Sequence, residues 1–490
     1  MKCTLSSRPI DAQASDALIV FVQNKKPLLD DKSALKKLIE DQIKQTKFTG
    51  ETLQTIVFPT FGKTKAKQII LAGLGDAADF RMEYLEHAAA AAVRSGKKAG
   101  ANKFSTSPSS TLPSVEESAW IHSVARGAAW GSYDFTTFKT ANKKVVVSLS
   151  LSICCNNNAA NKRALSEATA ESDALLSTAD LANQPGNIAT PQAIATWAKT
   201  MAKEMGLTCS VLNKAELKKQ NCNALLAVAA GSDLDAKMVT LKYKGTDPKA
   251  KPIVLVGKTI TFDSGGISLK PGKDMSWMLY DKCGGMAVLT AMKMVALLKP
   301  KSPVIGILTV AENMPGSKAT RPGDIIKSRA GKTIEILNTD AEGRLALCDA
   351  LDLALTHKPA AIVDLATLTG AVIVALGHTA SAVIGNNSEL IQTLIRSGAD
   401  AGERLWELPL WKEHKDDIKG TFADLQNIGK SGTAGTITAG AFLSEFVPDD
   451  IPWAHIDIAG TAWVQSPAPW TAPGATLFGA RTLIEWIKNL

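Results

Sequence analysis

The residues of this sequence that could carry out chemistry gather where predicted strands end. An apolar run over 253–256 leads into GKTITFDSGGISLK, which places Lys258, Asp263 and Lys270 around a Gly-Gly pair. Asp281 follows, just before a predicted helix. Glycine lets the backbone approach a bound group closely, and in sheets covered by helices the site lies at the carboxyl ends of the strands. This stretch is therefore one half of a candidate site.

A second polar cluster follows the apolar run 334–337, where the sequence NTDAEGRL leads into a predicted helix. In an extended segment residues i and i+2 point to the same side, so Asp340 and Glu342 are expected to present two carboxylates to one point. Converging carboxylates repel one another unless cations neutralise them. Oxygen-rich ligation of this kind suits manganese, magnesium or zinc.

The alternative interpretation is that each acid is a helix cap or a surface charge. For Asp340 or Asp281 taken alone that interpretation would win, because an acid just before a helix is commonly a cap. Four acids at strand-to-helix junctions, two of them beside lysines, favour a metal centre. The six histidines are scattered without an HExxH motif, and the seven cysteines include no CxxC pair, so neither a zincin-type site nor a zinc ribbon is expected.

Alternating strands and helices must position these residues. Strands are predicted in the first part of the chain at 17–22, 55–58 and 68–75, and in the second part at 239–243, 253–257, 304–311, 333–337, 361–365 and 454–458. Helices are predicted between the later strands at 284–298, 343–356, 439–446 and 476–488. This alternation predicts an α/β protein whose larger part has a central mixed sheet covered by helices on both faces.

The 490 residues are expected to divide into two domains. A smaller N-terminal α/β domain is predicted over 1–160. Residues 161–184 are expected to form a linker helix, because Ala, Leu and Glu recur at helical spacing until the NQPGN run stops the pattern. A larger α/β catalytic domain is predicted over 185–490.

Composition and charge exclude several classes of protein. With 45% hydrophobic and 21% charged residues the chain is neither collagen-like nor disordered. The net charge of +8 is diffuse, with no run of five Lys or Arg to bind phosphates. No signal-peptide-like stretch opens the sequence, and the most apolar segment, 360–385, contains Asp364, His378 and a Gly-Thr-rich middle. These features predict a cytoplasmic protein without a membrane span.

Taken together, the two clusters resemble the leucine (cytosol) aminopeptidase family. The resemblance rests on NTDAEGRL at 338–345 and on VGKxITFDSGGISLK at 256–270. It extends through further blocks in the same order, at 312–316, 321–324, 364–370 and 453–461. Almost all of 183–490 is covered, whereas the first 160 residues resemble the family only in layout.

The resemblance implies a two-metal site, with Mn²⁺ or Zn²⁺ as the expected ions. Asp263 and Glu342 would share both ions, Asp340 would complete one of them, and Lys258 with Asp281 would complete the other. Ligation by Lys258 requires a neutral amine, so its pKa must fall far below the free value of about 10.4.

The family also implies catalytic roles for Lys270 and Arg344. A water between the ions would attack the scissile carbonyl, a metal and Lys270 would stabilise the oxyanion, and a bicarbonate held by Arg344 would take and return the proton. The expected substrates are peptides with a free N-terminus, with Leu or Met preferred in a first-residue pocket. That pocket and the rest of the substrate site would be lined by Met278, Asn338, Thr367, Leu368 and Gly370.

The sequence departs from the family pattern around Asp281. The family usually reads MKxDMxGA, but here Leu279 replaces the lysine and Lys282 replaces the methionine. Because successive side chains point apart, Lys282 is expected to face away from the ions, towards a subunit boundary or solvent. These departures are expected to change the reaction rate, the metal preference or the shape of the substrate pocket, and not to remove the activity.

Two alternatives stay open from the sequence alone. The resemblance implies a homohexamer of two stacked trimers, and some bacterial members also bind DNA, so nucleic-acid binding is conceivable but not expected for a diffuse charge without a recognisable motif. The second alternative is a catalytically weakened structural relative, which the intact NTDAEGRL motif disfavours.

Overall fold

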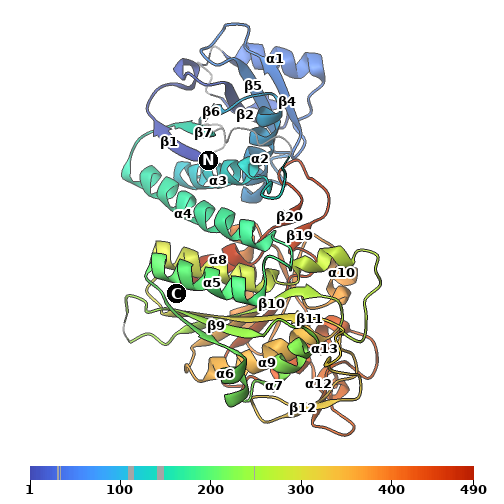
Figure 1. Ribbon diagram of the computed structural model, residues 1–490. Coiled ribbons are helices and arrows are strands. Elements are labelled where there is room, and N and C mark those ends of the chain that lie inside the picture. The colour runs from blue at the N-terminus through green and yellow to red at the C-terminus, as the bar shows by residue number, and fades with distance from the viewer. Residues whose placement is uncertain (30–32, 34, 109–114, 141–147, 248) are drawn as a thin grey trace. The chain divides into compact units, whose positions relative to one another are not determined.

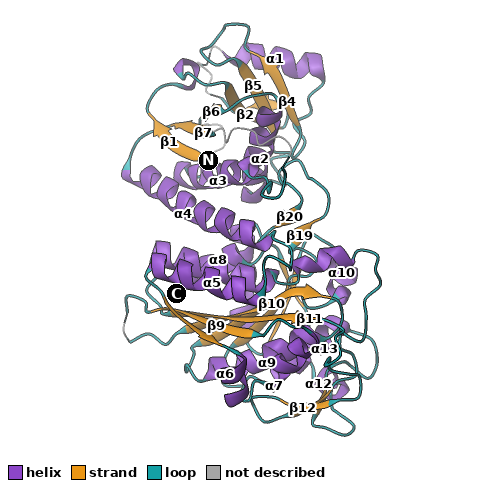
Figure 2. Ribbon diagram, viewed as in Figure 1, coloured by secondary structure: helices purple, strands orange, loops and turns teal. Residues whose placement is uncertain are grey.

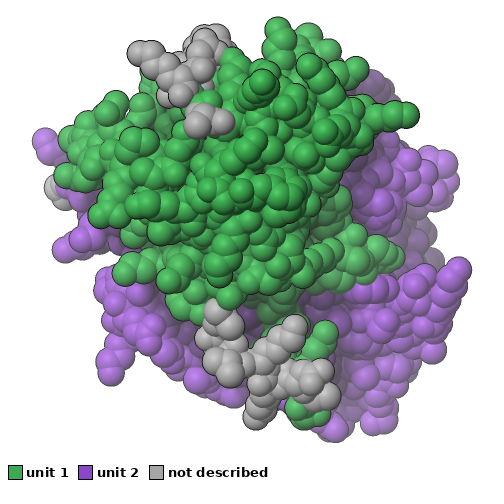
Figure 3. Space-filling view, turned by 90° about the horizontal axis from the view of Figure 1, so that it is seen from above, with its two compact units in different colours: residues 1–176, 464–473 green, residues 177–463, 474–490 purple. Residues whose placement is uncertain are grey.

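The chain builds two compact units in this computed structural model, and it returns to the first unit near its end. Unit 1 comprises residues 1–176 and 464–473, and unit 2 comprises 177–463 and 474–490 (Figure 3). The structure describes residues 1–29, 33, 35–108, 115–140, 148–247 and 249–490. Among these residues no helix is both long and apolar enough to cross a membrane.

Unit 1 contains a mostly parallel sheet with the strand order β1-β7-β6-β2-β5-β4, in which β4 and the short β3 are antiparallel to their neighbours. The strands are β1 (Lys2–Ser6), β2 (Ala17–Gln23), β3 (Lys26–Pro27), β4 (Thr55–Pro59), β5 (Gln68–Gly73), β6 (Lys103–Thr106) and β7 (Ser150–Cys154). The helices are α1 (Leu35–Thr46), α2 (Met82–Lys98), α3 (Glu117–Ser132) and α4 (Ala159–Ala182), with a short 3-10 turn η1 (Ile10–Ala12).

Strand β2 explains why this sheet is covered on both faces. Ile19 and Phe21 pack in one apolar cluster with residues of α2 and α3, whereas Leu18 and Val20 pack in another with residues of α1. Successive side chains of a strand point to opposite faces, so an unbroken apolar run requires a helical layer on each side. The helix predicted over 161–184 corresponds to α4, which ends at Ala182, and the division between the units falls within it.

Unit 2 contains an eight-stranded mixed sheet with the order β16-β15-β18-β14-β10-β11-β9-β8. Strands β11, β10, β14 and β18 are parallel, and β9 and β15 are antiparallel to the neighbours that flank this group. The strands are β8 (Thr208–Leu212), β9 (Lys237–Tyr243), β10 (Ile253–Asp263), β11 (Val304–Asn313), β14 (Ala361–Ala366), β15 (Ser381–Gly385), β16 (Leu405–Glu407) and β18 (Trp453–Asp457). The predicted α/β class with a central mixed sheet is confirmed.

Helices cover both faces of this sheet, with α5 and α8 on one side and α7, α9 and α13 on the other (Figures 1 and 2). Val254 and Val256 of β10 pack with Leu345 of α9, while Gly257 lies against Gly285 of α8. The helices of unit 2 are α5 (Pro191–Met205), α6 (Lys214–Lys219), α7 (Asn223–Val228), α8 (Cys283–Leu298), α9 (Glu342–Leu355), α10 (Gly370–Leu376), α11 (Ser388–Ala401), α12 (Lys412–Asp417), α13 (Gly435–Ser444) and α14 (Ala480–Lys488), with 3-10 turns η2 (Ala229–Gly231) and η3 (Met275–Tyr280).

One predicted strand does not join the central sheet. The run 333–337 forms β13 (Thr333–Glu335), which belongs to a separate three-stranded sheet with β12 (Ile325–Lys327) and β17 (Leu425–Gln426). The antiparallel partner β12 precedes β13 closely in the chain and takes up its ladder hydrogen bonds. A two-stranded pair, β19 (Trp463–Val464) and β20 (Gly474–Ala475), completes the strands of the described residues.

Candidate metal centre and active site

The central strand β10 supplies the first two polar residues of the site. Its partners are β14 and β11, and its register with β11 shifts between Ile260 and Asp263, at the carboxyl end of the sheet. Lys258 and Asp263 are only 3% and 2% exposed. Buried charges at the carboxyl ends of parallel strands are costly unless partners or a ligand compensate them.

The second pair of acids lies on a turn, not on the extended segment that the sequence suggested. The Asn338 side chain accepts a hydrogen bond from the backbone N–H of Asp340 at 2.8 Å, and α9 begins at Glu342. The two carboxylates lie on the same side because of this Asx-type turn, and not because they alternate along an extended strand. One carboxylate oxygen from each of Asp263, Asp340 and Glu342 lies within 4.8 Å of the other two.

Lys258 connects these acids to Asp281. Its Nζ lies 2.7 Å from Glu342 Oε1 and 2.9 Å from Asp281 Oδ1, and it donates to the Thr367 backbone carbonyl at 2.8 Å. A Cβ at Gly343 would lie 2.7 Å from the same Nζ, so only glycine leaves room for this lysine at the start of α9.

The charge state of Lys258 is set by its neighbours. Burial by itself would lower the pKa of the amine, but the carboxylates of Asp281 and Glu342 outweigh burial and hold the pKa well above its usual value. Lys258 can bind a metal only as a neutral amine. Cations beside Nζ would lower its pKa and so favour that neutral form.

Lys270 lies at the more open side of the cluster. Its Nζ is 3.0 Å from Asp263 Oδ2 and 2.5 Å from Asp340 Oδ1, and its side chain is 22% exposed. A Cβ at Gly265, whose φ is +87°, would lie 2.8 Å from Asp340 Oδ1, so this glycine permits the close approach of the two loops. Among the predicted residues, Lys270 thus combines a cationic group with access from solvent.

The donor set fits divalent cations. Asp281 Oδ2 is buried and has no hydrogen-bond partner among the described residues. Burial and the nearby Asp263 carboxylate raise the pKa of Glu342, and burial raises that of Asp281. Keeping these buried carboxylates ionised and close together is unfavourable without cations. Carboxylate oxygens are ligands that bind Mn²⁺, Mg²⁺ and Zn²⁺ in proteins.

Arg344 lies in the first turn of α9 and is buried. Its Nη1 donates to the Asn427 carbonyl at 2.8 Å, while its Nε has no hydrogen-bond partner in the described part of the chain. Burial lowers the pKa of the guanidinium to about 10, against the opposing effect of Glu342 and Asp457, so it remains a cation at neutral pH. A buried cation with a free donor fits a small anion such as bicarbonate.

The predicted substrate-site residues lie on three segments around the cluster. Met278 belongs to η3, just before Asp281. Thr367 follows β14 and donates through Oγ1 to Asp281 Oδ1 at 2.7 Å, whereas the Leu368 N–H donates to Asp457 Oδ1 and Gly370 begins α10. Asn338 shapes the turn before α9. Of these residues, Thr367 donates to the carboxylate of Asp281, and Asn338 accepts from the backbone N–H of Asp340.

Comparison with known protein families identifies the family of the chain. The catalytic-domain model of the cytosol aminopeptidase family matches residues 177–484, and the N-terminal-domain model of the same family matches residues 19–142. The chain belongs to the cytosol aminopeptidase family.

Individual relatives cover nearly the whole chain. A probable cytosol aminopeptidase of Geobacter sp. (strain M21) is 43% identical over 449 residues, which is 90% of each protein. That of Syntrophotalea carbinolica is 39% identical over 100% of both chains. Among solved structures, the bottromycin maturation enzyme BotP in complex with Mn is 31% identical, with a TM-score of 0.85 over 97% of this chain and 99% of that one.

Membership of the cytosol aminopeptidase family establishes the class of reaction. The protein is a metal-dependent aminopeptidase, a hydrolase that acts on peptides. Neither the DNA-binding alternative nor the catalytically weakened alternative finds support in these relatives.

Two positioning residues were not evident from the sequence. Asn427, fully buried, accepts the Leu337 N–H through Oδ1 and donates to the Asn338 carbonyl through Nδ2, and so holds the turn that carries Asp340. Thr339 donates to the Gly265 carbonyl at 2.7 Å. Thr339 lies inside the NTDAEGRL motif, but the motif gives no sign that its hydroxyl bonds to another loop. The sequence around Asn427 contains no motif that indicates a site.

Lys282 departs from the family pattern and is directed away from the acids. Its Nζ donates to the Gln184 carbonyl at 2.9 Å and also to the Leu279 carbonyl. The side chain faces away from the cluster, as expected, but it is fully buried and not directed to solvent. Burial lowers the pKa of this amine to about 8.

Replacing Lys282 by methionine is expected to leave the dependence of activity on metal concentration unchanged, because the amine binds carbonyl groups and not the acids. It should also alter the pH dependence of stability. A folded pKa of about 8, below the unfolded value of about 10.4, makes the wild-type protein gain stability as pH rises between these values. The variant should lack that rise. Mn²⁺ activation curves and thermal unfolding from pH 7 to 10.5 measure both effects.

A shift of the Lys282→Met activation curve to lower Mn²⁺ concentration would contradict this placement, since it would show that the ammonium repels cations at the cluster.

Proposed function

We propose that this aminopeptidase releases N-terminal residues at a two-ion site, with Mn²⁺ or Zn²⁺ held by Lys258, Asp263, Asp281, Asp340 and Glu342. The observation that carries the proposal is the convergence of three carboxylates from two separate segments within 4.8 Å, beside a fourth acid with an unpartnered oxygen. When bound, the two ions would supply a water nucleophile at neutral pH and polarise the scissile carbonyl.

The protein's own side chains would divide the remaining work. Lys270, the cation nearest solvent, would donate to the oxygen of the scissile carbonyl as negative charge develops there. The free α-amine of the substrate would bind one of the ions and contact the Asp281 carboxylate, which restricts the reaction to unblocked N-termini. Arg344 would hold a bicarbonate ion, which supplies a proton acceptor and donor.

Substrate preference would depend on the segments next to these groups. Met278 would line the pocket for the first side chain and favour Leu- or Met-like residues, because an apolar wall binds apolar side chains best. Asn338, Thr367, Leu368 and Gly370 would complete the peptide site.

The assembly and location proposed with this function follow the family resemblance. The enzyme would be a cytoplasmic homohexamer built as a dimer of trimers, with peptides as its partners. Its charge of +8 is spread over the chain and is not proposed to bind nucleic acid.

Hydrolysis of leucine p-nitroanilide after metal removal tests the proposal. The protein stripped with EDTA is expected to be inactive, and separate addition of Mn²⁺, Zn²⁺ and Co²⁺ should restore activity to different extents. N-acetyl-leucine p-nitroanilide is the matched control, because acetylation removes the basic amine that would bind an ion and contact Asp281.

Two results would contradict the proposal. Full activity after EDTA treatment would exclude an essential ion, and equal cleavage of the acetylated substrate would exclude recognition of the free amine.

A further inference from the structure

Asn313 is the last residue of β11, and β-sheet pairing places it directly beside Asp263. The two residues are register partners just after the shift between β10 and β11. The Asn313 side chain is buried, at 4% exposure. Its Nδ2 donates to Asp263 Oδ1 at 2.8 Å and to the Thr339 carbonyl at 3.1 Å. One amide group therefore connects a candidate metal ligand with the turn that carries Asp340.

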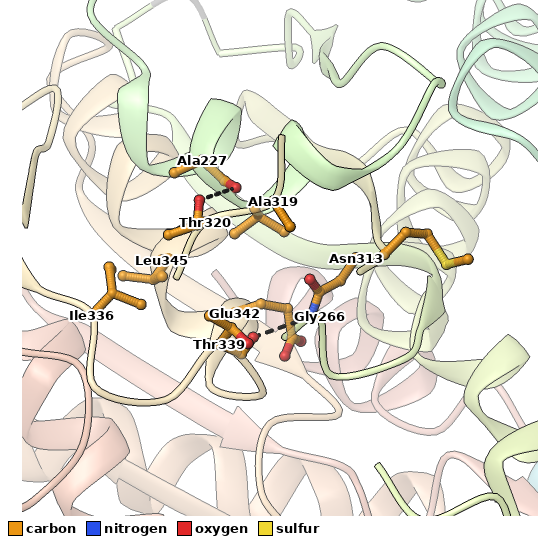
Figure 4. A pocket seen from close by; sticks show the side chains of 11 residues that line it. Ala227, Gly266, Asn313, Ala319, Thr320, Ile336, Thr339, Glu342 and Leu345 are labelled. Carbon is orange, nitrogen blue, oxygen red and sulfur yellow. Dashed lines mark hydrogen bonds between the residues drawn. The ribbon is translucent and has the colours of Figure 1, made fainter. Parts of the chain in front are cut away.

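Figure 4 shows this amide at the wall of a small cavity, with Thr339 and Glu342 beside it. The cavity has a volume of about 10 Å³, no larger than one water molecule requires. A Cβ on Gly266 would lie 2.9 Å from Asn313 Oδ1, which shows how closely the loop after Asp263 packs against the amide oxygen.

The chemistry of the contacts fixes the orientation of the amide. Asp263 Oδ1 and the Thr339 carbonyl are both acceptors, so only the NH₂ group can face them; a flipped amide would place three acceptor oxygens together. Because an amide carries no net charge, it orients the carboxylate without competing with a cation. The second carboxylate oxygen, Asp263 Oδ2, stays free of the amide and faces Lys270.

Asn313 shares this task with two other groups: the Gly265 N–H also donates to Asp263 Oδ1 at 2.9 Å, and Lys270 lies against Asp263 Oδ2 and Asp340 Oδ1. Further hydrogen bonds join these segments without reaching a carboxylate of the cluster. The Ser268 N–H donates to Thr339 Oγ1 at 2.8 Å, and the Thr339 N–H donates to Ser268 Oγ at 3.1 Å. The Ser264 hydroxyl and N–H both donate to the Asn313 carbonyl. Asn313 is thus anchored through its backbone and directs its side chain at the ligand.

We propose that Asn313 is a positioning residue of the metal centre, which sets the orientation of the Asp263 carboxylate and its spacing from the Asp340 turn. The inference rests on the proposed two-ion site. Groups that hydrogen-bond to a ligand and not to the metal typically change metal affinity or activity about 10- to 100-fold when they are removed.

Metal binding to the Asn313→Leu variant tests this role. Leucine has the same branched shape with somewhat larger end groups but no donor, so the carboxylate loses its orientation while the side chain still lines the cavity. The Kd for Mn²⁺ of the EDTA-stripped variant, measured by equilibrium dialysis, is expected to rise about 10- to 100-fold. Activity on leucine p-nitroanilide should fall at limiting Mn²⁺ and recover at high Mn²⁺, with KM unchanged.

Asn386→Leu is the matched control. Asn386 also lies in unit 2, donates to the Ile451 carbonyl and accepts from the Trp453 N–H, so the substitution removes two comparable hydrogen bonds away from the acids. Both variants should lose similar thermal stability. The control should bind Mn²⁺ as the wild-type protein does.

An Mn²⁺ Kd for Asn313→Leu equal to that of the wild-type protein would overturn the inference while leaving the proposed function intact. If the wild-type protein itself bound no Mn²⁺, the proposed function would fail, and this inference with it. Should Asn313→Leu not fold, Asn313→Ser serves in the same measurement, because its short hydroxyl does not reach Asp263 and its expected weakening of Mn²⁺ binding is the same.

Discussion

Glu342→Ala is expected to abolish both metal binding and peptide hydrolysis while the protein stays folded. Glu342 begins α9, lies against Lys258 at 2.7 Å and is one of the three converging acids. Its pKa is raised by burial and by Asp263, so the ionised side chain is costly in the fold without cations. Removing it relieves that cost but takes one carboxylate from the buried Lys258 ammonium, which keeps Asp281 at 2.9 Å. The stripped protein should therefore stay folded, and the main loss should appear in functions that need the ions.

Thermal unfolding with and without Mn²⁺ separates these effects. A bound ion stabilises the folded state according to its concentration over Kd, so Mn²⁺ should raise the Tm of the wild-type protein and not that of Glu342→Ala or Asp340→Ala. Activity should fall by about three orders of magnitude or more, because the stabilisation from the ions amounts to several kcal/mol.

Glu389→Ala is the control for the effect of removing an acidic residue from the first turn of a helix. Glu389 is an exposed acid in the first turn of α11, where it interacts with the helix dipole as Glu342 would under the capping interpretation. Full metal occupancy in Glu342→Ala and Asp340→Ala, measured by elemental analysis, would contradict the two-ion site.

The sequence was sufficient to predict the class of fold because its apolar runs are long and regular. Strand β10 was nevertheless predicted only to 257, although it continues to Asp263. Thr259 and Thr261 lie fully buried in this extension and donate to the Gly257 and Ala311 carbonyls. Because these hydroxyl groups form hydrogen bonds inside the fold, this part of β10 is buried although its sequence is polar.

The positions of the acids could be predicted, but the manner of their convergence could not. Asp340 and Glu342 face one point because Asn338 and Asn427 shape a turn, and Asn427 comes from a distant part of the chain. The pairing of Asp263 with Asn313 depends on a register shift between two strands. Such contacts arise from tertiary packing and leave no local pattern of spacing. The roles of the site residues remain predictions.

Lys270→Ala is expected to reduce turnover by about two to three orders of magnitude, the usual effect of removing one donor to a developing oxyanion. Unlike Glu342→Ala, this variant should retain its affinity for Mn²⁺. The Lys270 ammonium lies against Asp263 Oδ2 and Asp340 Oδ1, where it competes with cations for the carboxylates. Its removal should leave the Kd for Mn²⁺ unchanged or lower. Lys273→Ala, an exposed lysine on the same loop, is the control and should behave as the wild-type protein.

Arg344→Ala should be milder than Lys270→Ala, because the two side chains would act on different parts of the reaction. Lys270 would contact the reacting oxygen, and no solute replaces a donor held at that position. Arg344 would act only by holding a base, and water or added bicarbonate can partly take over that role. The test is kcat for leucine p-nitroanilide in buffers with and without bicarbonate, with KM measured in parallel. Added bicarbonate should raise kcat of Arg344→Ala and leave that of Lys270→Ala unchanged. A larger loss of kcat in Arg344→Ala than in Lys270→Ala would show that this division of roles is wrong, and that the buried guanidinium itself acts on the transition state.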